Sequence, residues 1–122
     1  PLSQLKTIEK LRSTSLNIDV EQIGAGFTSK GDRQDHIIAA KSGLKAVAES
    51  IANYDMIIAD EINYALSGRL IEESEVLNLM KLANDKGVHF ILTGRGSTQK
   101  MQDLADTVTM MMKIMVIILK LN

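Results

Sequence analysis

The chain has 122 residues, enough for one domain with a single hydrophobic core. Its formal net charge is −1 with basic and acidic residues interspersed, so no basic face predicts a nucleic-acid partner. The lack of cysteine excludes disulfides and thiolate chemistry, and the longest apolar run, residues 114–119, is far too short to cross a bilayer. We therefore expect a cytoplasmic protein in which residues 1–122 form one domain.

The first half of the chain predicts a helix, a strand, a loop and a longer helix. Apolar residues at helical spacing indicate a helix over Ser3–Arg12, and alternating apolar residues indicate a strand over Asn17–Gly24. A glycine-rich loop, Gly24–Asp32, comes next. A long amphipathic pattern then predicts a helix from about Asp32, which can cap it, to Asn53.

The second half begins with Met56–Ala59, which is continuously apolar. That pattern is expected of a strand buried on both faces, as in a parallel sheet covered by helices. The remaining predicted elements are a helix over Glu72–Lys86, a strand over Val88–Thr93, a short helix from Ser97 or Thr98 to Ala105, and a strand over Thr107–Met112. Strands alternate with helices, so the pattern predicts an α/β parallel sheet with right-handed crossovers.

Three loops of unusual composition follow predicted strands: Gly24–Asp32, Asp60–Ser67 and Gly94–Ser97. In a parallel sheet such loops lie at the carboxyl edge, where ligands bind. We therefore expect the three loops to converge on one side of the sheet.

The acidic pair Asp60-Glu61 ends a wholly apolar strand. Mg²⁺ is commonly held by one or two carboxylates together with phosphate oxygens, so the pair suits a magnesium–triphosphate site. A helix cap with a solvated neighbour explains the same spacing equally well. Asn63 and Tyr64 follow closely enough to line the same pocket, although Tyr64 could equally pack into the core.

Gly94-Arg95-Gly96 follows the next predicted strand. Glycines bare the backbone amides for an anion, and arginine offers a forked donor to phosphate. The alternative interpretation is a tight turn with a surface arginine.

Phe27 is an apolar residue in the otherwise polar loop Gly24–Asp32. It either tucks into the core or touches a large flat ligand. His36 and His89 have no partner at metal-ligand spacing, and we interpret both as structural.

Three strings in order resemble one family. They are Gly24–Thr28 with Asp32-Arg33 downstream, Tyr54–Leu66, and Leu92–Gly96 followed by Leu104–Thr109. Together they are similar to the P-loop type of ATP:corrinoid adenosyltransferase, over about Leu5 to Met112. The resemblance implies a three-layer, parallel-sheet P-loop NTPase fold of the RecA-like kind, truncated at its N-terminus.

The resemblance also implies a function: transfer of the 5′-deoxyadenosyl group of ATP to the Co(I) of a corrinoid such as cob(I)alamin, releasing triphosphate. The site residues implied by matching position are Glu61 and Asp60 for Mg²⁺; Gly94, Arg95, Gly96 and Asn63 for ATP and its phosphates; and Gly26, Phe27 and Thr28 for the corrinoid. A homodimer and a flavoprotein reductant are the implied partners.

The sequence departs from the family pattern at three places. It contains no Gly-x-x-x-x-Gly-Lys-[Ser/Thr] loop, and it begins at Pro1 without an initiator Met. Ser29 stands where the family often has an aromatic residue, and the tail lacks the family's Lys-His pair and Gly-Ile-acidic-aromatic ending. We therefore expect a fragment with impaired activity that self-associates. The alternative function is a non-catalytic module that binds a corrinoid, a nucleotide or a partner subunit, with an unrelated P-loop ATPase remnant as a third.

Overall fold

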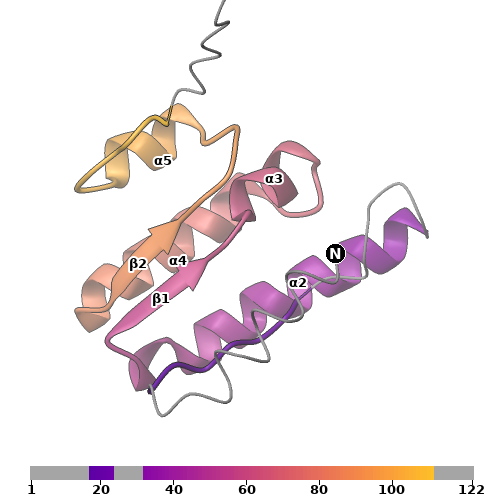
Figure 1. The fold of residues 1–122 in the computed structure, drawn as a ribbon. Helices are drawn as coiled ribbons and strands as arrows, with labels where there is room; N and C mark the ends of the chain where they lie inside the picture. Colours follow the sequence, from indigo (N-terminus) through magenta and orange to yellow (C-terminus); the bar gives the residue numbers. More distant parts are fainter. Residues whose placement is uncertain (1–16, 24–31, 112–122) are drawn as a thin grey trace, which may run out of the picture.

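The computed structural model describes residues 17–23 and 32–111, and the elements in it are mixed α and β (Figure 1). In chain order they are α2 (Arg33–Ser50), the 3₁₀ helix η1 (Ile51–Asn53), β1 (Met56–Ala59), α3 (Ile62–Ser67), α4 (Glu73–Lys86), β2 (His89–Leu92) and α5 (Gln99–Leu104). The helix predicted over Ser3–Arg12 lies outside the described residues, as do residues 24–31 and 112–122.

The two long helices begin where capping residues predict. Asp32 precedes α2, and its side chain accepts a hydrogen bond of 3.0 Å from the backbone N–H of Gln34. Before α4, the N–H of Glu72 donates to the carboxylate of Glu75 at 2.7 Å. Gly87 ends α4 with a φ of 67°, a conformation that glycine adopts without a Cβ penalty. The predicted helices 32–53 and 72–86 are therefore confirmed, the first as α2 followed by the 3₁₀ helix η1.

β1 and β2 form a parallel pair in which Met56 lies opposite His89 and Ala59 opposite Leu92. The two strands run side by side, with α4 behind them and α2 at the lower right beside β1 (Figure 1), and α4 contacts both β2 and α2. Ala59 and Leu92 pack against the core cluster on that face; its buried members are Ile62, Ile71, Val76 and Met101. The predicted parallel pairing is confirmed, and the described residues form an α/β fold in which helices cover one face of a small parallel sheet.

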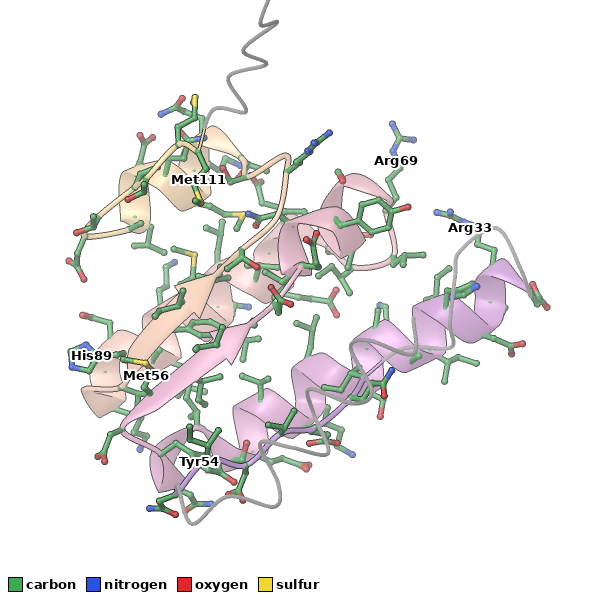
Figure 2. The ribbon with its side chains drawn as sticks, viewed as in Figure 1. Arg33, Tyr54, Met56, Arg69, His89 and Met111 are labelled. Carbon is green, nitrogen blue, oxygen red and sulfur yellow. The ribbon has the colours of Figure 1, made fainter. Side chains whose placement is uncertain are left out.

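The opposite face of this sheet is open in the described part of the chain. Met56 and Ile58 are 50% and 60% exposed, and His89 and Ile91 beside them are exposed too. Figure 2 shows Met56 and His89 together at the start of the strands. The prediction that Met56–Ala59 is buried on both faces is therefore wrong for the described residues, because their helices all pack on one side and alternate side chains point to the other.

Residues 17–23 are not the strand predicted over Asn17–Gly24. They run along α2 instead (Figure 1), with Ile23 against Gly43, while the hydroxyl of Tyr54 donates to Asp19 at 2.8 Å. A Cβ on Gly43 would lie 2.5 Å from the Ile23 side chain, so the close approach requires a glycine. The segment pairs with no strand among the described residues, and most of its side chains are exposed, including Ile18 at 48% and Ile23 at 44%.

The strand predicted over Thr107–Met112 is also wrong as far as it is described. Residues 107–111 have no regular structure and are exposed, Met110 and Met111 strongly so. Apolar composition favours a strand only where a neighbouring strand can pair with it, and these residues have none in the described structure. Across residues 17–23 and 32–111, no helix has the length and hydropathy that a membrane crossing needs.

Candidate functional site

The junctions that follow β1 and β2 lie against each other at the carboxyl edge of the sheet. The N–H of Thr93 donates to the carbonyl of Ala59 at 3.3 Å, and the carbonyl of Thr93 accepts from the N–H of Asn63 at 3.2 Å. These bonds continue the strand pairing by one residue and join the start of α3 to the loop after β2. The predicted convergence of the second and third loops is confirmed, whereas residues 24–31 of the first loop, with Gly26, Phe27 and Thr28, lie outside the described residues.

The acidic pair is held by a single hydroxyl. Thr93 Oγ1 donates to Asp60 Oδ1 at 2.7 Å and accepts from the backbone N–H of Glu61 at 2.9 Å. Both acidic residues are exposed. Glu61 precedes α3, yet its side chain makes no capping hydrogen bond. The carboxylate of Glu61 therefore does not serve as the helix cap that the sequence left open as an alternative.

Glu61 adopts a left-handed backbone conformation, with φ 61° and ψ 19°. For a residue with a side chain this conformation costs roughly 1–2 kcal/mol, so it persists only where the surroundings hold it. The holding groups here are the Thr93 hydroxyl on the N–H of Glu61 and the first turn of α3 on its carbonyl, which accepts from Tyr64 at 3.0 Å and Ala65 at 3.4 Å.

Gly94 brings the third loop, Gly94–Ser97, close to the acidic pair. Its φ is 112°, and a Cβ there would lie 3.2 Å from Glu61 Oε2 and 3.2 Å from the Cβ of Asn63. Gly96 has a φ of 87°, and a Cβ there would lie 3.2 Å from the side chain of Ser67. Both positions need glycine for their backbone conformation and for the close approach of α3.

Asn63 holds the loop after β2 through a hydrogen bond. It is 5% exposed, and its Nδ2 donates to the carbonyl of Gly94 at 3.0 Å. Its Oδ1 is buried with no hydrogen-bond partner among the described residues. The structure thus places Asn63 as a tie to the loop backbone, and its contact with a nucleotide stays a prediction.

Arg95 stands between the two glycines and is exposed. Of the ion pairs within the described residues, none includes Arg95, Asp60 or Glu61. The edge therefore presents two carboxylates and one guanidinium that form no ion pair with the described residues, a combination suited to a metal-bound polyanion. Tyr64 is about half exposed rather than packed in the core.

The donor set fits Mg²⁺ only as a partner of phosphate. Within the described residues, no group of three or more His, Cys, Asp and Glu side chains could hold a metal ion. Two neighbouring carboxylates are nevertheless what Mg²⁺ commonly takes from a protein when phosphate oxygens and water complete its coordination. His36 is buried in α2, and His89 lies on the open sheet face at the start of β2, which is the end opposite the carboxyl edge.

Two residues of this region were not predicted to take part in the site, although both stand in the strings that resemble the family. Thr93 is one. The sequence feature that could have found it is a hydroxyl residue directly after β2, the strand that pairs with β1 and its acidic pair. Arg33 is the other, and its guanidinium donates to the carbonyls of Gly68 at 3.1 Å and Arg69 at 3.2 Å. Figure 2 shows Arg33 and Arg69 at the same end of the molecule, where Arg33 fastens the end of α3 to the start of α2.

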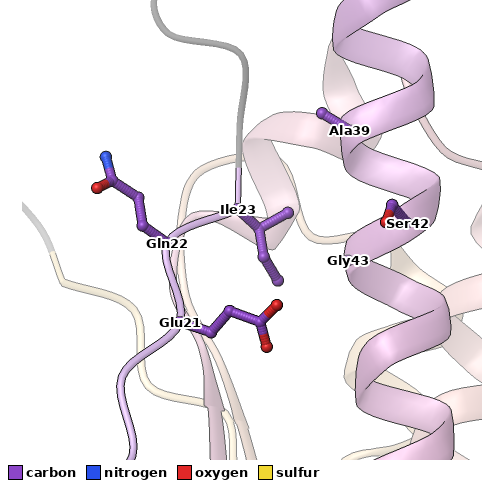
Figure 3. Close-up of a pocket in the computed structure, with 6 residues that line it drawn as sticks. All are labelled: Glu21, Gln22, Ile23, Ala39, Ser42 and Gly43. Atoms are coloured by element: carbon purple, nitrogen blue, oxygen red, sulfur yellow. The ribbon is translucent and has the colours of Figure 1, made fainter.

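A separate cavity of about 200 Å³ lies between residues 17–23 and α2 (Figure 3). Its lining residues are Glu21, Gln22, Ile23, Ala39, Ser42 and Gly43. It contains no residue of the acidic pair or of the glycine loop. The chemistry of the carboxyl edge, rather than this hollow, therefore defines the candidate site.

Comparison with known proteins bears on this edge. The family model for the ATP:corrinoid adenosyltransferases BtuR/CobO/CobP matches residues 2–118. The chain is 37% identical over 92 residues to a corrinoid adenosyltransferase of Pseudomonas aeruginosa, covering 73% of this chain and 45% of that protein. It is 33% identical over 92 residues to a corrinoid adenosyltransferase of a Sinorhizobium species, covering 73% of this chain and 43% of that protein.

The chain thus spans somewhat less than half the length of these relatives. No solved structure gave a significant match. The family match runs through both junctions of the carboxyl edge, from Asp60 to Gly96, and through every described element. On this evidence the chain belongs to the ATP:corrinoid adenosyltransferase family.

Proposed function

We propose that this chain carries the metal- and phosphate-binding edge of an enzyme that adenosylates corrinoids. In that reaction the Co(I) electron pair forms a bond to C5′ of ATP, the C5′–O bond breaks, and triphosphate leaves with its electron pair. The observation that carries the proposal is the carboxyl edge itself, where Asp60 and Glu61 are held against the Gly94-Arg95-Gly96 loop. Family membership supports the same reaction.

Different residues of the carboxyl edge would bind Mg²⁺ and the phosphates. Glu61, with Asp60 beside it, would hold Mg²⁺, which when bound neutralises phosphate charge and orients the leaving group. Arg95 donates to phosphate oxygens, and the backbone amides around Gly94 and Gly96 can approach an anion because no Cβ shields them. Asn63 keeps this loop in register with α3. Fixing the triphosphate in this way aligns C5′ for attack, which is where much of the rate arises.

The corrinoid contacts are proposed from the matching string alone. Gly26, Phe27 and Thr28 would meet the corrin, with Phe27 as the flat apolar contact. Co(I) requires an external reductant, and we propose a flavoprotein for that role, as the family resemblance implies. We place the reaction in the cytoplasm and infer a homodimer, which the open sheet face described above supports.

Binding and turnover test the proposal together. Because this sequence lacks a Gly-Lys-[Ser/Thr] phosphate loop, we expect Mg·ATP to bind the chain only weakly. Glu61→Gln and Arg95→Ala should each weaken that binding about tenfold or more in equilibrium dialysis. Matched controls are Glu49→Gln and Lys45→Ala, an exposed pair on α2, which should change nothing.

Adenosylation is assayed with Mg·ATP and chemically reduced cobalamin, by the light-sensitive product that contains a Co–C bond. Any turnover should be lost in Glu61→Gln and kept in Glu49→Gln. An Mg·ATP affinity that is unchanged in both Glu61→Gln and Arg95→Ala would contradict the proposal.

A second candidate function is a non-catalytic module, and the open sheet face favours it. Met56, Ile58 and Ile91 offer apolar surface that a partner subunit could cover. For this function we expect capture of a subunit by a chain that neither binds Mg·ATP at the acidic edge nor forms the Co–C product.

A further inference from the structure

Every polar group of Thr93 is used at the carboxyl edge. Its N–H and carbonyl continue the pairing between the strands, through Ala59 at 3.3 Å and Asn63 at 3.2 Å. Its hydroxyl donates to Asp60 at 2.7 Å and accepts from Glu61 at 2.9 Å. A hydroxyl has one donor, so orienting that proton toward Asp60 leaves its lone pairs for the N–H of Glu61. One side chain therefore sets both members of the acidic pair.

The effect on Glu61 is conformational. Its φ of 61° is held by the Thr93 hydroxyl on one side and by the first turn of α3 on the other. Without the hydroxyl, the N–H of Glu61 loses its partner and the left-handed conformation loses one of its two restraints. The carboxylate would then leave its place over Gly94, where Oε2 lies 3.2 Å from an ideal Cβ position.

The same residue begins the phosphate loop. Thr93 is bonded directly to Gly94, whose carbonyl is held by Asn63 at 3.0 Å. A displacement of Gly94 by a bound phosphate would therefore move the Thr93 backbone, and with it the hydroxyl that fixes the acidic pair. The coupling runs in both directions, as any linkage between two binding events must.

We infer that Thr93 is the positioning residue of this site, whose hydroxyl makes metal binding at Asp60-Glu61 and phosphate binding at Gly94–Gly96 depend on each other. The inference rests on the proposed function for its ligands, Mg²⁺ and the triphosphate of ATP. The bridge itself rests only on the two hydrogen bonds of the hydroxyl.

Amide hydrogen exchange on the full chain, read by NMR, tests the bridge without any ligand. Thr93→Val keeps the side-chain shape and removes the hydroxyl, and should speed exchange at the Glu61 amide about five- to tenfold. Thr93→Ser keeps a hydroxyl and should restore slow exchange. Exchange at Val76, in the core of α4, reports overall folding and should stay within about twofold in both variants. Unchanged exchange at Glu61 in Thr93→Val overturns the inference.

The ligand arm measures ATP binding with and without Mg²⁺ by equilibrium dialysis. In the parent chain Mg²⁺ should tighten ATP binding, so the dissociation constant without Mg²⁺ should exceed the one with Mg²⁺. Thr93→Val should reduce the ratio of these two dissociation constants about tenfold, and Thr93→Ser should recover it. Thr98→Val is the matched control, since Thr98 lies in the same loop but caps α5 through the N–H of Met101. It should leave the ratio unchanged.

The two arms separate the inference from the function on which it rests. A parent chain that binds no Mg·ATP sinks the proposed function, while exchange at Glu61 still decides whether Thr93 positions the pair. A ratio that Thr93→Val leaves intact, in a chain that does bind Mg·ATP, overturns the coupling.

Discussion

At the scale of single residues, the carboxyl edge is closely packed. Gly94 has a φ of 112° and faces both Glu61 and Asn63 at the distance of close contact. Glu61 adopts the left-handed conformation in spite of its side chain. Such strained conformations persist where neighbouring hydrogen bonds over-determine them, and here those bonds come from Thr93 and Asn63.

Gly94→Ala should therefore cost stability twice, once for the positive φ and once for the contacts of the new methyl group. We expect a loss of about 2 kcal/mol or more in the free energy of unfolding, measured by urea denaturation. Gly87→Ala is the matched control: its φ is 67° but nothing lies within 4 Å of the added Cβ, so about 1 kcal/mol is expected. Equal losses in the two variants would show that the loop does not pack tightly on the acidic pair.

At the scale of elements, α5 is fastened to α4 beside the same loop. Lys100 pairs with Glu73 at 3.3 Å, and Thr98 caps α5. A hydrogen bond from Thr98, followed by the Lys100 contact, holds the pKa of Glu73 below its ordinary value of 4.5, although some burial acts the other way. These contacts fix where the loop between β2 and α5 ends.

The lowered pKa of Glu73 predicts a pH dependence with a definite sign. A carboxyl whose folded pKa lies below its unfolded value stabilises the fold above the unfolded pKa and loses that contribution as pH falls through the folded one. Glu73→Gln should therefore weaken the chain slightly at neutral pH and make no difference at strongly acid pH, in urea denaturation from about pH 7 to about pH 3. The effect is small because the group is solvent-screened. A Glu73→Gln effect of equal size at both extremes would contradict this account.

At the scale of the whole molecule, the helices of the described residues all pack on one face of the sheet. The other face exposes Met56, Ile58 and Ile91, a larger apolar surface than a lone side chain would leave. Parallel sheets are ordinarily covered on both faces, so this surface is where a second layer or a second copy would pack.

Ile58→Lys should shift a self-associating chain toward monomer in sedimentation velocity, because a charge then stands in the middle of the open face. Ile38→Lys on α2 is the matched control, since Ile38 is 59% exposed and Ile58 60%, and it should leave association unchanged. The same response in both variants would show that general hydrophobicity, and not this face, drives association.

Local patterns sufficed for much of the fold and of the edge. The Asp32 cap, the helix ending at Gly87 and the apolar strand Met56–Ala59 are all readable from neighbouring residues, because capping and periodicity act over a few positions. The convergence of Asp60-Glu61 with Gly94–Gly96 follows from one further step, the rule that parallel strands share a carboxyl edge. The family assignment, made on the same strings, is confirmed by the match over residues 2–118.

The sequence by itself thus determined the order of the central elements and brought two of the three loops together. Tertiary structure alone decided that residues 17–23 and 107–111 form no strand, since a strand needs a partner that local pattern does not reveal. It also decided that helices cover only one sheet face in the described part, and that Thr93 holds the acidic pair. The hydrogen bonds of the Thr93 side chain reach Glu61 and Asp60, which stand 32 and 33 positions earlier in the sequence. Contacts of that span depend on how the strands pack, which no stretch of neighbouring residues encodes.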